Sequence, residues 1–88
     1  MEVKLKVKHF IGATYLKKGE CPISRSLNEH FETNGAWDAI TTCTIPKGTQ
    51  KLKYRHEPYR IDMYMQDVST VESHRRDPEF TIRTITLN

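Results

Sequence analysis

Apolar and polar residues alternate through the first nine positions of the chain. From Glu2 to His9, the side chains of Val3, Leu5 and Val7 lie on one side of an extended backbone, and the lysines between them lie on the other. This period is typical of a β-strand with one buried face. We therefore predict a strand over Glu2–His9 whose outer face is basic and carries Lys4, Lys6 and Lys8.

A second basic strand is predicted near the middle of the chain. Trp37–Ile45 is rich in threonine and β-branched residues, and Pro46-Lys47-Gly48 follows it as a turn sequence. Apolar and basic residues then alternate through Lys51–His56. This strand places three further cations on one outer face, at Lys51, Lys53 and Arg55.

The same alternation continues through Arg60–Val68, where an isoleucine and two methionines occupy the apolar phase. This pattern predicts the third strand of an antiparallel meander, with Tyr64 in the polar phase beside the basic face. Glu79–Leu87 predicts a last strand. Its apolar residues change sides part of the way along, which indicates either a bulge near Arg83 and Thr84 or a strand covered on both faces.

Capping signals predict helices in two places. A Ser-x-x-Glu capping box at Ser26–Glu29 and a later Asn-Gly stop predict a short helix that begins at Leu27, with Leu27 and Phe31 facing the core. A second capping box at Ser69–Glu72 is followed by an Asp-Pro stop. It leaves Thr70–Arg76 as one or two helical turns or as an ordered loop.

Together these elements predict a single α+β domain over residues 1–88. We expect a mostly antiparallel sheet of five or six strands, with one short helix on its apolar side and a second helical turn near its end. The chain is polar, with 36% hydrophobic and 28% charged residues, so its core is small for its surface.

Several functional classes lack a signal in this sequence. The net charge of +3 is mild. Cys21 and Cys43 are too far apart for a Cys-x-x-Cys metal site, the four histidines show no ligand spacing, and no paired-carboxylate or triad motif occurs. We therefore expect a non-enzymatic protein with no catalytic residue, metal or cofactor. The lack of a long apolar run predicts a cytoplasmic protein that avoids membranes and has reduced thiols, although the spacing also permits a disulfide.

The basic residues are the main candidates for contact with a partner. Side chains on one face of a strand are about 6.6–6.8 Å apart, which is comparable with phosphate spacing on an extended nucleic-acid strand. A solvated lysine face that keeps the protein soluble, or one that meets an acidic protein, fits the same pattern. The basic group His74-Arg75-Arg76 fits anion recognition or a helix C-terminus. The candidate contact residues are Lys4, Lys6, Lys8, Lys51, Lys53, Arg55, Arg60, Tyr64, Arg75 and Arg76.

Three segments resemble the C-terminal sheet of RelE/ParE-type toxins: Leu52–Arg55, Tyr59–Tyr64 and His74–Phe80. In the ribonuclease members of that superfamily, basic side chains handle the RNA phosphate and a tyrosine near the end assists cleavage. The resemblance assigns these roles to Arg55, Arg60, Arg75 or Arg76, and Phe80. The last of these has no hydroxyl, and the helical pair that precedes the sheet in the family has no counterpart in the predicted strands of residues 1–45.

Cys43–Thr49 is similar to a segment in small phage-encoded proteins of unknown role. We therefore expect a binding protein, in its specific form a phage or mobile-element accessory factor that inhibits or redirects a host or defence complex. Its basic face would contact an acidic protein surface. The alternatives are a nucleic-acid-binding module and a RelE/ParE-like ribonuclease toxin.

Overall fold

The computed structural model describes residues 2–17, 19–32, 43–47, 50–54 and 59–86, and for residues 43–54 it describes the backbone alone. Three helices and four strands occur in these ranges. In chain order they are β1 (Glu2–Lys6), α1 (Val7–Phe10), α2 (Pro22–His30), β2 (Cys43–Lys47), β3 (Gln50–Tyr54), α3 (Ile61–Ser73) and β4 (Thr81–Thr86).

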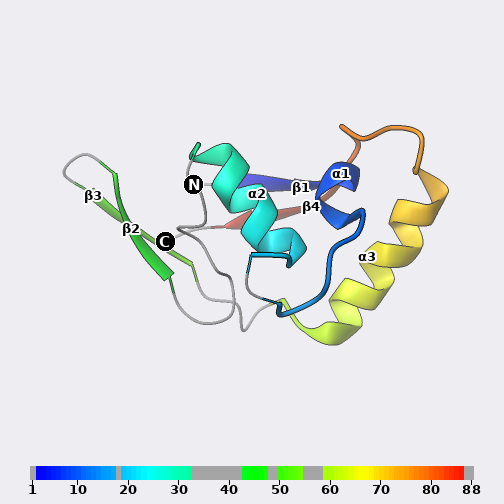
Figure 1. The fold of residues 1–88 in the computed structure, drawn as a ribbon, viewed down its shortest axis with the longest axis horizontal. Helices are drawn as coiled ribbons and strands as arrows, with labels where there is room; N and C mark the ends of the chain where they lie inside the picture. Colours follow the sequence, from blue (N-terminus) through cyan, green and yellow to red (C-terminus); the bar gives the residue numbers. More distant parts are fainter. Residues whose placement is uncertain (1, 18, 33–42, 48–49, 55–58, 87–88) are drawn as a thin grey trace.

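The described strands form two separate two-stranded sheets, so the predicted sheet of five or six strands is wrong. β1 pairs with β4, and β2 pairs with β3, both antiparallel. Figure 1 shows the β2–β3 hairpin at one end of the long axis, apart from β1 and β4. The fold is a small α+β fold in which the two basic strands, β1 and β3, share no sheet. Lysine alternation marks the outer face of a strand but carries no information about its partner.

The buried face of β1 is confirmed. Val3, Leu5 and Val7 are almost completely buried, and Val3 lies opposite Ile85 of β4. The strand nevertheless ends at Lys6, three residues before the predicted end, because α1 begins at Val7. Apolar contact between the inner faces of β1 and β4 therefore explains a pairing that joins the two ends of the chain.

The predicted irregularity of the last strand is also present. The register moves from Leu5 opposite Arg83 to Lys6 opposite Thr81, which leaves Ile82 as an extra residue in β4. Such an extra residue is a β-bulge and changes the side on which the following side chains lie. It occurs within two residues of the predicted position.

The segment Arg60–Val68 is not a strand, because Ile61–Val68 forms the first part of α3 and Arg60 is its N-cap. Two of its apolar-phase residues, Ile61 and Met65, are 53% and 60% exposed, whereas Asp67 is buried. The three-stranded meander is therefore wrong at its third strand. The second predicted helical turn is correct in part, since Thr70 to Ser73 form the last turn of the same helix.

The core-facing residues of α3 recur at helical spacing, and the apparent alternation of apolar and polar residues obscures this spacing. Tyr64, Val68 and Val71 pack on or within the core, and Asp67 completes this face at positions i, i+3, i+4 and i+7. A carboxylate at one of four core-facing positions weakens the helical signal in the sequence. The isoleucine and methionines at alternate positions then dominate the apparent period.

α2 begins five residues before the predicted start. Pro22 occupies its first turn, where the missing amide hydrogen costs nothing, and Cys21 is the N-cap. The Ser26 hydroxyl donates to the Ile23 carbonyl at 2.9 Å and does not cap the helix. The inward positions are confirmed, because Leu27 is fully buried and Phe31 packs against the core.

The core lies between the β1–β4 sheet and the helices. α2 packs on β1, while α3 contacts β4 and α1. In Figure 1, α2 crosses in front of the sheet and α3 lies on the side opposite the β2–β3 hairpin. The predicted strand residues 37–42 and the positions Arg55, His56 and Leu87 lie outside the described part of the chain.

Candidate binding groove between β1 and α2

Two of the three predicted cations of the first strand form ion pairs within the protein. Lys6 Nζ lies 2.6 Å from Glu79 Oε2, and Lys8 Nζ lies 2.9 Å from Glu79 Oε1. Lys8 also lies 2.9 Å from Glu29 Oε1 on α2. The outer side of this strand is therefore a mixed-charge cluster, in which two glutamates neutralise the two lysines.

The titration of this cluster follows from its contacts. Hydrogen bonds from Lys6 and then Lys8 lower the pKa of Glu79 to about 2. A hydrogen bond from Lys8 lowers the pKa of Glu29, and hydrogen bonds to Glu79 and then Glu29 raise the pKa of Lys8. All three groups are charged at neutral pH, so Glu79 and Glu29 remain acceptors for the lysines.

His9 is a buried imidazole at the end of this cluster. Its Nδ1 accepts the backbone amide hydrogen of Lys6 at 2.9 Å, which assigns the neutral-state proton to Nε2. Nε2 lies 3.3 Å from Glu29 Oε2 but has no partner in hydrogen-bond geometry among the described residues. Burial lowers the pKa of His9, although Glu29 opposes this effect. The ring therefore holds a buried N–H beside the Glu29 carboxylate, outside hydrogen-bond geometry.

A groove of about 210 Å³ lies beside this histidine. One wall comes from β1 and the other from α2. The lining residues are Glu2, Val3, Lys4, Lys6, His9, Ser26, Glu29 and His30. Lys4 is exposed and forms no ion pair with any acidic residue in the described ranges. The groove thus presents one ammonium group without an acidic partner, which suits an anionic group, beside the buried ring of His9.

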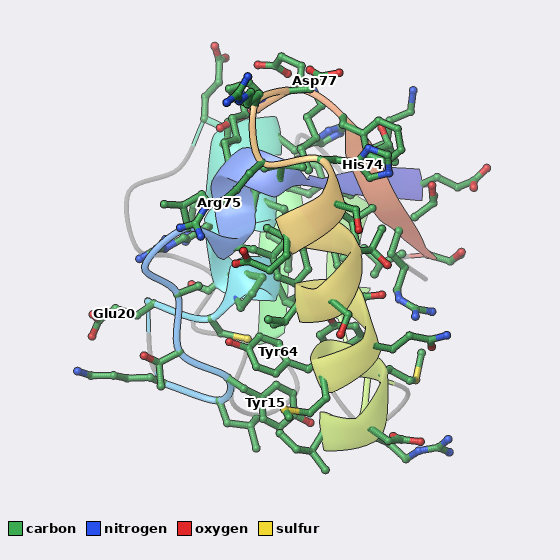
Figure 2. The ribbon with its side chains drawn as sticks, turned by 90° about the vertical axis from the view of Figure 1, so that its right-hand side faces the viewer. Tyr15, Glu20, Tyr64, His74, Arg75 and Asp77 are labelled. Carbon is green, nitrogen blue, oxygen red and sulfur yellow. The ribbon has the colours of Figure 1, made fainter. Side chains whose placement is uncertain are left out.

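The second basic group forms the turn after α3. Arg75 Nη1 lies 3.0 and 3.1 Å from the two carboxylate oxygens of Glu72, and the His74 ring stacks on Phe80 with centroids 3.8 Å apart. Figure 2 shows His74 and Arg75 on opposite sides of this turn. Arg76 is exposed and forms no ion pair with a described residue. All three residues line an open hollow of about 420 Å³, but Arg75 is held there by Glu72 and His74 by Phe80.

The remaining candidates are dispersed. Arg60 pairs with Asp62 at 3.3 Å at the start of α3. Tyr64 is half-buried, and its ring centroid lies 5.2 Å from that of Tyr15. It is therefore not the surface residue that the predicted strand implied. The structure groups the lysines of the first strand and its extension, but it adds neither Arg60 nor Tyr64 to them. The structure does not describe the side chains of Lys51 and Lys53 or any part of Arg55.

The C-terminal sheet implied by the toxin resemblance is also wrong. Tyr59–Tyr64 leads into and begins α3, whereas the resemblance places it in a sheet. Phe80, at the position of the family's tyrosine, stacks on His74. The tyrosines and the arginine of this segment lie at the start of α3, where Arg60 is the N-cap.

The sequence patterns did not predict a buried network formed by Asp67, Arg83 and Tyr59. The Asp67 carboxylate accepts from Arg83 Nε at 2.7 Å, from Arg83 Nη2 at 3.0 Å and from the Tyr59 hydroxyl at 2.7 Å. Burial, followed by the hydrogen bond to Asp67, raises the pKa of Tyr59. The network connects α3 to β4 and leaves the carboxylate fully engaged, which gives it a structural role. The one signal in the sequence is an aspartate at a core-facing helical position, and it becomes visible once the helix is known.

No group of three potential metal ligands converges in the described part of the chain, and none of the described helices has the length and apolarity needed to cross a membrane. We take the groove between β1 and α2 as the candidate site, because it adjoins the buried His9 and contains Lys4. No protein-family model, no curated protein and no solved structure matches this chain.

Proposed function

We propose that the protein is a small non-enzymatic binding protein whose partner presents an acidic protein surface. The observation that carries this proposal is a lysine without an acidic partner in the groove between β1 and α2. Lys4 has no acidic partner in the described ranges, whereas Glu29, on the opposite wall, is held by Lys8 and His9. An incoming carboxylate would gain a charge-assisted hydrogen bond from the Lys4 ammonium group.

The ion pairs favour a protein partner over nucleic acid. A protein that follows a phosphate backbone needs several cations free to replace counterions. Here Lys6 and Lys8 form ion pairs with Glu79 and Glu29. The first strand and its extension therefore carry a local excess of hydrogen-bond donors but no continuous row of free cations. A local excess suits one or a few carboxylates.

In its specific form, the proposal is a phage or mobile-element accessory factor that inhibits or redirects a host or defence complex. Its support is the similarity of Cys43–Thr49 to segments of small phage-encoded proteins. β2 contains the first five residues of that segment. Such a factor would act by occupying a macromolecular surface, with no chemical step.

The test is purification of partners from the source cells on immobilised protein, before and after nuclease treatment. The informative variant is Lys4→Glu, and the matched control is Lys17→Glu, which makes the same charge change at an exposed lysine outside the groove. We expect one protein to be retained stoichiometrically by the wild type and the control, to be weakened by Lys4→Glu, and to withstand nuclease. Retention of no protein, or retention that nuclease abolishes, would contradict the proposal.

A further inference from the structure

β1 has one paired edge among the described residues. β4 lies along this edge, and the amide of Val7, directly after β1, donates to Phe80 just before β4 at 3.0 Å. The preceding amide, that of Lys6, points to the other side, where His9 Nδ1 accepts its hydrogen. Successive amides of an extended chain face opposite edges. The Lys6 amide therefore marks the open edge of β1, and His9 closes this edge at its C-terminal end.

The groove follows this open edge. By the same alternation, Lys4 directs its backbone amide and carbonyl to the side that the Lys6 amide faces. Both residues line the groove, and Ser26, Glu29 and His30 of α2 form its opposite wall. A groove between an open strand edge and a helix can accept an extended peptide, because the edge supplies main-chain hydrogen bonds and the walls contact alternate side chains.

The charges of the groove define what such a peptide would carry. Glu29 is already paired with Lys8 and lies 3.3 Å from His9 Nε2, whereas Lys4 has no acidic partner in the described ranges. The other acidic wall residue, Glu2, lies at the far end of β1 from His9. A carboxylate is therefore favoured at Lys4 and disfavoured beside Glu2 at the start of the strand.

We propose that the groove between β1 and α2 binds an extended, carboxylate-bearing peptide segment, which adds as a strand to the open edge of β1. This inference rests on the proposed function and names the class of its partner. An added strand lies about 4.8 Å from the edge that it joins. At that distance the peptide backbone can pair with Lys4, while one of its carboxylates reaches the lysine ammonium group.

The experiment uses a short fluorescent peptide of alternating valine and glutamate, titrated into the full chain and followed by anisotropy and by amide chemical shifts. One control peptide has the same sequence with methyl groups on alternate backbone nitrogens, which keeps its charge and blocks strand pairing. A second control replaces glutamate by lysine. The protein variants are again Lys4→Glu and the control Lys17→Glu.

We expect shifts at the amides of Val3–Lys6 and Ser26–His30, and slower hydrogen exchange at the Lys4 amide when the peptide is bound. Lys4→Glu should weaken binding by about tenfold or more, as the loss of one charge-assisted contact implies, and the Lys17→Glu control should not. Both control peptides should bind at least about tenfold more weakly than the parent peptide.

Other results would overturn the inference and would separate it from the proposed function. Equal affinity for the methylated peptide, or shifts outside the groove, would remove strand addition and leave an acidic partner in place. Failure of the peptide to bind, with a purified partner still sensitive to Lys4→Glu, would have the same meaning. Binding of single-stranded RNA that Lys4→Glu abolishes, with no response to the peptide, would overturn both proposals.

Discussion

Glu2–His9 and Arg60–Val68 show the same alternation of apolar and polar residues, yet the first is mainly a strand and the second is a helix. In the first segment, the apolar phase is the buried phase. In the second, the apolar phase includes Ile61 and Met65, which are exposed, and the core-facing positions recur at helical spacing. A period of two over a few residues therefore identifies a strand only where the same residues fail to form a helical face.

The two segments also differ in how each buries one polar side chain. Asp67 of α3 meets Arg83 and the Tyr59 hydroxyl, so its carboxylate oxygens are fully engaged. His9 uses Nδ1 to accept from the Lys6 amide, while Nε2 has no hydrogen bond to any described residue. The satisfied group belongs to the structural network, and the unsatisfied one lines the candidate groove. A buried polar group without a partner marks a site more clearly than a buried polar group with one.

Truncation of the apolar phase should separate the two segments most strongly. Leu5→Ala should lower the free energy of unfolding by about 3 kcal/mol, because Leu5 is fully buried. Met65→Ala, in the same phase of the other segment, should change it by less than about 0.5 kcal/mol, because Met65 faces solvent. Urea denaturation measures both. Similar losses would mean that Met65 is buried, as a strand predicts.

Removal of the buried carboxylate should have the next largest effect. Asp67→Ala leaves the Arg83 guanidinium and the Tyr59 hydroxyl without their acceptor, and we expect a loss of about 2 kcal/mol because the Arg83 side chain keeps 27% exposure. The matched control is Asp62→Ala on the same helix. Its pair with Arg60 is exposed, so its removal should cost less than about 1 kcal/mol. Equal effects in urea denaturation would contradict the network.

Acid should destabilise the protein through His9. Burial lowers the pKa of His9 below its ordinary value of 6.5, so the unfolded state binds a proton before the folded state as the pH falls. The free energy of unfolding should therefore decrease from about pH 7.5 to 5.5. His9→Asn, whose side-chain oxygen can still accept from the Lys6 amide, should reduce this decrease, and His30→Asn should preserve it. An unchanged slope in His9→Asn would contradict the assignment.

The smallest effect is the sharpest test of the comparison, because it should reverse sign between the segments. Gln66 is an exposed position of α3 and Lys4 an exposed position of β1. Valine in place of alanine should cost about 0.5 kcal/mol at position 66, because β-branching disfavours a helix. It should stabilise by a similar amount at position 4, because β-branching favours a strand. Thermal denaturation of the four single variants measures both differences, and the same sign at both positions would contradict the assigned elements.

Local features of the fold were predictable from the sequence. The buried face of β1, the bulge in β4, the hairpin of β2 with β3 and the inward position of Leu27 all follow from patterns of a few residues. The start of α2 was missed because a Ser-x-x-Glu sequence inside a helix looks like a cap, although Pro22 already marked its first turn. α3 was missed because Asp67 interrupts its apolar face.

The sequence predicted the cations of the candidate site but not the acidic residues that pair with them. The alternation of Lys4, Lys6 and Lys8 placed cations on the outer side of the first strand, but it gave no sign that Glu79 and Glu29 neutralise two of them. Those acids lie far from the lysines in the sequence. Which cation stays free therefore depends on contacts that no local pattern contains.

The sequence by itself determined which face of β1 is buried and that the chain combines strands with helices, because these properties depend on neighbours within one turn or one strand. The tertiary structure decided that β1 pairs with β4, that Arg60–Val68 is helical, and that His9 lies buried beside Glu29. Each of these depends on which distant side chains supply the apolar contact or the opposite charge. A local sequence pattern shows whether a residue requires burial or an opposite charge. Only the tertiary structure shows which distant residue supplies it.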